Sequence, residues 1–211
     1  MSELDFIYKR KSIRDFKETA VPKEDILKML EAATYAPSPK HQQNWHFVVV
    51  QDQEKIKQMA EAVAKSHEAI ANMMETEEEQ KKYMKFLPYY TAFQRGPVAI
   101  VVYAKPYDMI EEKVLMANNV SEEVLEVLRS PQSAAQGIGA AVENFLLAAA
   151  NMGYGTCYMT GPAHAKSEIE KIIGFDKPEY SMMSIIALGV PQDETPKQPR
   201  RKPLEDVVTF L

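Results

Sequence analysis

Residues 36–50, APSPKHQQNWHFVVV, carry the chain from the end of a helix through a polar loop into a strand. Residues 23–36 place apolar side chains at helical spacing, and Pro37 ends the helix because a proline does not fit its interior. After Trp45, the only tryptophan, the β-branched run HFVVV is typical of a strand. Helices and strands are therefore mixed along this chain.

The remaining elements extend this pattern. Residues 98–104, VAIVVYA, are entirely apolar and predict a strand that is buried on both faces. A long helix is predicted at 132–152, and Gly153 after it suits a left-handed cap. Because helices and strands do not alternate strictly, the sequence predicts an α+β fold with a central mixed sheet covered by helices. Further strands are predicted at 155–160 and 182–190, and a further helix at 166–173, closed by Gly174.

Residues 53–95 are polar and rich in methionine and tyrosine, and they predict a largely helical, solvated excursion over the core. The excursion contains an aromatic group. It has two interpretations, an anchor to the core or a set of stacking surfaces for a flat ligand. The members are Tyr83, Phe86, Tyr89, Tyr90 and Phe93.

Composition limits the class of protein. With 211 residues and 45% hydrophobic content, residues 1–211 are expected to form a single domain. A net charge of -5 gives no general reason to bind nucleic acid or an anionic membrane. The longest apolar stretch, 137–150, is too short to span a bilayer. A single cysteine, Cys157, and an N-terminus without an apolar signal segment lead us to expect a cytoplasmic protein.

Two basic clusters stand out in this acidic chain. The first contains Lys9, Arg10, Lys11 and Arg14, and the second, at residues 197–202, contains Lys197, Arg200, Arg201 and Lys202. Neither cluster contains an acidic residue, so the two would bind one phosphate if they converged. On charge alone, two solvated surface patches are an equally good interpretation.

A series of motifs resolves this choice. RKSIRDF at 10–16, APSxxxxQxWxFVVV at 36–50, AAVENFLLAA in the long helix, GYGTCYMTG at 153–161 and RKPLEDVV at 201–208 occur in this order. In that conjunction the chain resembles the FMN-dependent nitroreductase family over nearly its whole length. Lys11, His41 and Asn44 depart from the commonest family residues, which are a second arginine, asparagine and proline respectively.

The resemblance implies an FMN site built from two identical subunits. Arg14 would lie beside the N1/O2 edge of the flavin, where a cation stabilises the negative charge of the reduced ring. The phosphate and ribityl chain would be held by Arg10, Lys11 and Ser12, completed by Arg201 and more weakly by Arg200. Pro37, Ser38, Pro39, His41 and Gln43 would reach the flavin from the partner subunit, and Met159, Thr160 and Gly161 would line the other side of the ring.

The resemblance also implies the activity. The chain is expected to form a homodimer whose C-terminal extension reaches the partner. It would reduce nitroaromatics, quinones or similar small electrophiles by ping-pong hydride transfer, with NADH or NADPH as donor. Residues 72–95 would then roof the flavin, and 206–211 (DVVTFL) would form a strand. The alternatives are a flavin dehalogenase, another flavin enzyme on this fold, or a non-catalytic flavin-binding protein.

Catalysis is assigned to the flavin itself, with Arg14 as an electrostatic stabiliser. Cys157 has no base near it in sequence and is expected to be a small core residue. The four histidines show no metal-ligand spacing, so no metal is expected. Gly137 and Gly139 open a long helix without a preceding strand, which argues against a dinucleotide fingerprint.

Overall fold

A four-stranded sheet forms the centre of the computed structural model, which describes residues 4–193 and 199–211. The strand order is β1-β2-β4-β3. The strands are β1 (Trp45–Val50), β2 (Val98–Ala104), β3 (Gly155–Met159) and β4 (Ser181–Gly189).

The pairing corrects the expected mixed sheet, since all the pairs between these strands are antiparallel. Val50 at the end of β1 lies opposite Ala99 at the start of β2. The connection between the two strands thus leaves and returns at one end of the sheet, which forces the antiparallel direction. Among the described residues, parallel pairing is limited to an isolated bridge between Ser12 and Thr156.

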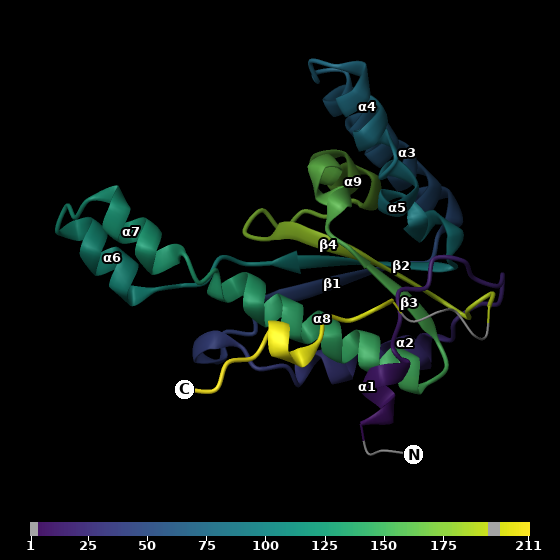
Figure 1. Cartoon of the computed structure of the whole chain (residues 1–211), viewed down its shortest axis with the longest axis horizontal. Helices are drawn as coiled ribbons and strands as arrows, with labels where there is room; N and C mark the ends of the chain where they lie inside the picture. The colour runs from purple at the N-terminus through teal and green to yellow at the C-terminus, as the bar shows by residue number, and fades with distance from the viewer. Residues whose placement is uncertain (1–3, 194–198) are drawn as a thin grey trace.

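Helices cover both faces of the sheet (Figure 1). On one face lie α2 (Lys23–Thr34) and α8 (Ser133–Asn151), whose Met29 and Phe145 are fully buried. On the other lie α3 (Gln53–Ala71) and α9 (Lys166–Ile173), which pack against the opposite side chains of β2 and β4. The result is a three-layer α+β architecture.

Several predicted features are confirmed. All seven residues of β2 are buried, as expected for a strand with helices on both faces. The predicted long helix is α8, and Gly153 and Gly174 adopt left-handed φ values of 84° and 72° after α8 and α9. These conformations favour glycine because a Cβ would crowd the backbone.

The 53–95 segment is helical as predicted, but its solvated character is only partly correct. Its first helix, α3, buries Ile56, Met59 and Val63 under the sheet, so it belongs to the core. The 3.6-residue spacing of these apolar positions explains the burial of one face. The remainder forms α4 (Glu77–Met84), α5 (Leu87–Tyr90) and a 3-10 turn, η2 (Ala92–Arg95).

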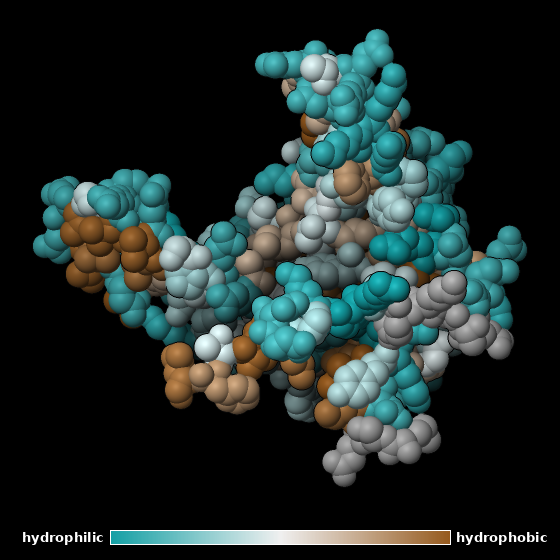
Figure 2. All heavy atoms as spheres, in the orientation of Figure 1, coloured by the Kyte–Doolittle hydropathy of each residue, from teal (hydrophilic) through white to brown (hydrophobic). Residues whose placement is uncertain are grey.

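Two helices without a counterpart among the sequence predictions project from the body (Figure 1). They are α6 (Ile110–Ala117) and α7 (Glu122–Arg129), referred to below as the α6–α7 hairpin. Its ends are bridged by Arg129, which lies 2.6 Å from carboxylate oxygens of both Glu112 and Glu122. Figure 2 shows apolar side chains gathered on this projection. The exposed ones are Ile110, Val114, Met116, Val124 and Val127.

The two ends of the chain form short elements. The short helix α1 (Asp5–Lys9) packs on α8, and the C-terminal tail forms a 3-10 turn, η4 (Leu204–Asp206). In the single chain, residues 206–211 form no strand, and the predicted strand that reaches the partner subunit stays a prediction. Their side chains are exposed, Phe210 at 95%. In the described ranges, no helix has the length and apolar character needed to cross a membrane.

A histidine pair joins α3 to the turn after β3, η3 (Gly161–Ala165). His67 is fully buried and stacks on Tyr83 with ring centroids 3.9 Å apart. The centroid of His164 lies 5.7 Å from that of His67, and its Nδ1 lies 2.8 Å from Ser66 Oγ. Burial lowers the pKa of His164, and the neighbouring His67 lowers it further.

This lowered pKa predicts a loss of stability in acid. The unfolded chain takes up a proton near the ordinary value of 6.5, while the folded chain resists it. The contribution of His164 is therefore complete above that value and is lost as the pH falls toward the lowered pKa. We expect His164→Gln to flatten the decline in unfolding free energy between about pH 7.5 and pH 5.5, measured by urea denaturation.

Burial also lowers the pKa of His46. Because His46 is present in both the parent and His164→Gln, its contribution to the pH dependence of the unfolding free energy is the same in each. Parallel curves for the parent and His164→Gln would contradict the assignment.

Candidate functional site

The first basic cluster is fixed beside β3. Ile13 N donates a 2.8 Å hydrogen bond to Thr156 O, which lays residues 10–14 along the sheet edge. Gly155 permits this approach, since a Cβ there would lie 2.8 Å from the Ile13 side chain. The edge of β3 thus fixes the backbone of Ile13 and, with it, the positions of the adjacent residues Ser12 and Arg14.

Arg14 faces a cavity of about 420 Å³. Its guanidinium carbon lies 5.2 Å from the centre of the Tyr89 ring, a cation–π contact with α5. Its Nε atom is buried and makes no hydrogen bond in the described structure, although the guanidinium interacts with the neighbouring Cys157 thiol, a weak acceptor. A buried donor without an acceptor is costly, so this atom points to a ligand that supplies one. The cavity is lined by Ser12, Ile13, Arg14, Asp15, Pro88, Tyr89, Arg95 and Asp193.

A second arginine forms part of the same wall. Arg95 pairs with Asp15 at 2.7 Å and donates to Pro88 O at 3.1 Å. Asp15 is paired with Arg95, and the other charged residues of the lining are Arg14 and Asp193. The Arg14 guanidinium beside the Tyr89 ring can donate hydrogen bonds to an acceptor on a flat ligand.

The turn at 159–161 lies against α5. Met159 is buried at the end of β3, and Thr160 precedes η3. A Cβ at Gly161 would lie 2.5 Å from the Tyr90 ring, so the ring packs directly on this backbone. Tyr89 and Tyr90 therefore connect the predicted roof segment to Arg14 and to Gly161 respectively.

The aromatic group divides into buried and exposed members. Phe93 is fully buried, and Tyr83 stacks on buried His67, so these two anchor the segment to the core. Tyr89 and Phe86 are about half exposed, at 51% and 48%. For these two, a stacking role toward a flat ligand stays a prediction.

The loop at 37–43 lies elsewhere, against the first turns of α8. A Cβ at Gly137 would contact Pro39 at 3.5 Å, so the absence of a side chain there accommodates this loop. Gln43 N donates to Ser38 Oγ at 3.1 Å, and Gln43 Nε2 lies 2.9 Å from His41 Nε2. Further along α8, Gly139 has open space around it, whereas Ala141 is buried in the chain's own core.

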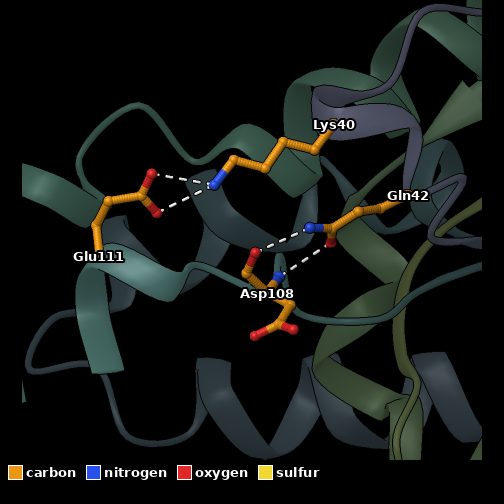
Figure 3. Close-up of polar contacts among 4 residues, drawn as sticks. All are labelled: Lys40, Gln42, Asp108 and Glu111. Atoms are coloured by element: carbon orange, nitrogen blue, oxygen red, sulfur yellow. Dashed lines mark hydrogen bonds and ion pairs between the residues drawn. The ribbon is translucent and has the colours of Figure 1, made fainter. Parts of the chain in front are cut away.

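The same loop is bound to the connection that leads from β2 to α6 (Figure 3). Lys40 Nζ lies 3.0 Å from Glu111 Oε1, and Gln42 makes two hydrogen bonds to the backbone of Asp108. The sequence predictions did not include Gln42 or the α6–α7 hairpin. The usable signal was the spacing of Val124, Leu125 and Leu128, which is typical of an amphipathic helix.

The single chain does not bring all the predicted site residues together. Figure 1 shows the 37–43 loop near the start of α8 and α1 near its end. Arg10 Nε pairs with Glu143 Oε1 at 3.2 Å, and Arg201 donates to Pro199 O at 3.0 Å. Arg200 is exposed, Lys11 is half-buried beside Ser12, and Lys197 lies outside the described residues.

Other nucleophiles and metal ligands offer no second centre. Cys157 is buried at 2% exposure, and burial raises the pKa of its thiol, an effect that nearby Arg14 offsets only in part. A protonated, buried thiol is a poor nucleophile. Within residues 4–193 and 199–211, no group of three or more His, Cys, Asp or Glu side chains is placed to hold a metal ion.

A sheet between two helical layers, with a cavity beside β3 that Arg14 and Arg95 line, defines the α+β architecture of the chain. The chain belongs to the nitroreductase family, whose model matches residues 7–190, and it is an enzyme of that family. An Archaeoglobus fulgidus protein, named as an NADH dehydrogenase or NAD(P)H nitroreductase, is 30% identical over 90% of this chain and 86% of its own.

Two solved structures extend the likeness. A BluB-like flavoprotein from Clostridium difficile 630 superposes with a TM-score of 0.94 at 36% identity, covering 100% of this chain and 99% of that one. An iodotyrosine deiodinase bound to FMN and 3-iodo-L-tyrosine has a TM-score of 0.71 at 24% identity, with 98% of each chain covered. The second likeness concerns the fold alone.

Proposed function

We propose that this chain is an FMN-dependent NAD(P)H oxidoreductase that reduces small electrophilic acceptors such as nitroaromatics and quinones. The observation that carries the proposal is the buried, unpartnered Nε of Arg14 beside Tyr89 in a cavity of about 420 Å³. A flavin edge offers the acceptor that Arg14 lacks, together with a flat ring for the tyrosine. FMN in a deiodinase of similar fold supports the choice of cofactor.

The phosphate of FMN would be held by Arg10, Lys11 and Ser12, with Arg201 and Arg200 joining from the tail. Arg10 now pairs with Glu143, whose side chain is 49% exposed. An ion pair of this exposure contributes little, whereas a phosphate accepts bidentate, charge-assisted bonds from arginine. Exchanging the carboxylate for a phosphate therefore favours the bound state.

The site would be shared between two chains. The 37–43 loop packs against Gly137 in the first turns of α8, whereas Arg10 pairs with Glu143 at the middle of that helix. A second copy, placed by a two-fold axis, would bring its 37–43 loop to the first chain's arginines. We propose that the enzyme works in the cytoplasm as such a homodimer, on small molecules and without nucleic acid.

FMN, when bound, supplies the two-electron chemistry that passes a hydride from NADH or NADPH to the acceptor. The chain's own residues bind and orient. Arg14 would stabilise negative charge at the pyrimidine edge, and the backbone of Met159, Thr160 and Gly161 would line the ring. Tyr89 and Tyr90 would exclude water from above.

The test begins with the purified protein. We expect a yellow protein that releases FMN on denaturation and oxidises NADH or NADPH when a nitroaromatic or quinone is added without oxygen. Comparing the two nicotinamides at equal concentration gives the donor preference. A colourless protein that cannot be reconstituted with FMN would overturn the proposal.

Reductive dehalogenation is a second candidate function. It is favoured by the similar fold of a deiodinase bound to FMN and 3-iodo-L-tyrosine, whose superposition covers 98% of each chain. With dithionite-reduced protein, iodide release from 3-iodo-L-tyrosine at a rate above that of nitroaromatic reduction would select this candidate, and no iodide release would reject it.

A further inference from the structure

Alternate residues of the loop that starts at Pro37 make different kinds of contact. Gln42 and Asn44 contact Asp108 and Lys105 in the β2–α6 connection, and Lys40 contacts Glu111 in the first turn of α6. His41 and Gln43, which lie between them, hydrogen-bond to each other. This antiparallel register, 40 with 111, 42 with 108 and 44 with 105, fastens one side of the loop and leaves the other side to a ligand.

Gln42 is the most specific of these fastenings. Its Nε2 donates to Asp108 O at 2.8 Å, and its Oε1 accepts from Asp108 N at 3.0 Å (Figure 3). Both polar atoms of the side-chain amide are thereby matched to the backbone N–H and C=O of one residue, which fixes the side chain in a single orientation. The Lys40–Glu111 pair is about half exposed, and such pairs contribute little.

The loop backbone needs such a fastening. Lys40, His41 and Gln43 have φ values of 48°, 54° and 45°, a left-handed region that costs energy for residues with a Cβ. Strained conformations of this kind persist only where surrounding contacts hold them. Gln42, at φ of -71°, sits between the strained residues and carries the contact.

We propose that Gln42 is a positioning residue of the flavin site. Its clamp on Asp108 holds His41 and Gln43 in the conformation that meets the partner subunit's flavin. The same two hydrogen bonds connect the 37–43 loop to the segment that leads into the α6–α7 hairpin. A displacement of the hairpin therefore weakens FMN binding. This inference rests on the proposed function, since it assumes FMN as the ligand.

The experiment compares Gln42→Met, which keeps the length of the side chain and removes both hydrogen bonds, with Gln42→Glu. The glutamate retains an acceptor for Asp108 N but has no donor for Asp108 O. Gln58→Met is the matched control, because Gln58 is exposed on α3 and makes one 3.2 Å bond to Glu54. Hydrogen exchange at the Asp108 amide in FMN-free protein reports the clamp, and FMN fluorescence on dilution reports cofactor release.

We expect Gln42→Met to speed both Asp108 amide exchange and FMN release by about tenfold, at an unchanged melting temperature. Gln42→Glu should be intermediate, and Gln58→Met should match the parent. A purely structural role would instead lower the melting temperature without a selective effect on FMN release.

Two failures are distinguishable. FMN binding by the parent protein is measured before any variant is made. A parent protein that does not bind FMN overturns both the proposed function and this inference. If the parent binds FMN but Gln42→Met releases it at the parental rate, the inference alone is overturned. Unchanged exchange at Asp108 would likewise show that the clamp does not hold in solution.

Discussion

Replacing Arg14 with methionine is expected to weaken FMN binding by about tenfold to a hundredfold. A charge-assisted hydrogen bond contributes roughly 1.5 to 3 kcal/mol, and about 1.4 kcal/mol corresponds to a factor of ten in affinity. Methionine keeps an apolar stem against the Tyr89 ring, so that the loss is mainly that of the guanidinium. Quenching of FMN fluorescence on titration measures the affinity.

The stability of the FMN-free variant separates a ligand-binding role from a structural one. Because Arg14 Nε is buried without a partner, removing it should leave the melting temperature of FMN-free protein unchanged or raise it. Lys171→Met is the matched control, since it removes one positive charge from an exposed pair with Glu168 on α9. Equal FMN affinity in Arg14→Met and the parent would show that the cavity is not the flavin site.

Deleting residues 204–211 is expected to weaken the dimer by about a hundredfold or more and to lower FMN retention in parallel. In the single chain, Leu204, Phe210 and Leu211 are at least 75% exposed, which is unfavourable for side chains of this size. Burying two of them against a partner contributes roughly 3 kcal/mol, which is about two decades in the dissociation constant. Sedimentation velocity across a dilution series, with absorbance of bound FMN, measures both quantities.

Full-length protein with Phe210→Ser and Leu211→Ser keeps the length of the tail and should reproduce most of the effect of the deletion. A truncated protein that remains a dimer with stoichiometric FMN would assign the tail no part in association. A full-length monomer that keeps FMN and full activity would contradict a site shared between subunits.

Much of the fold was predictable from local patterns. The apolar run of β2 and the helical spacing of α8 identify these elements because the sheet is buried on both faces and the helix packs with one face. Gly153 and Gly174 mark helix ends because only glycine takes left-handed φ values without cost. The direction of strand pairing was not predictable, because it depends on which end of the sheet each connection returns to.

The candidate site was predictable in part for a similar reason. The basic cluster at residues 9–14 stands out in an acidic sequence, and the order of the motifs indicates the family. The role of Gln42 was invisible in sequence, since its partner Asp108 is 66 residues away and the bonds are to backbone atoms. A hydrogen bond to a backbone atom does not require a particular residue type at the partner position, so the sequence gives no signal of it.

The sequence by itself determined the family, the residues that carry positive charge and most elements of the three layers, though not α6 and α7, because periodicity, caps and composition are local properties of the chain. Only the tertiary structure decided that Arg14 lies over Tyr89 with an unmatched buried donor, and that Gln42 clamps Asp108. It also placed the 37–43 loop beside Gly137 in the first turns of α8 and the Arg10–Glu143 pair at the middle of that helix. The physical reason is that hydrogen bonds and packing act between side chains brought together from distant positions, and their geometry is fixed only when the layers of the fold close on one another.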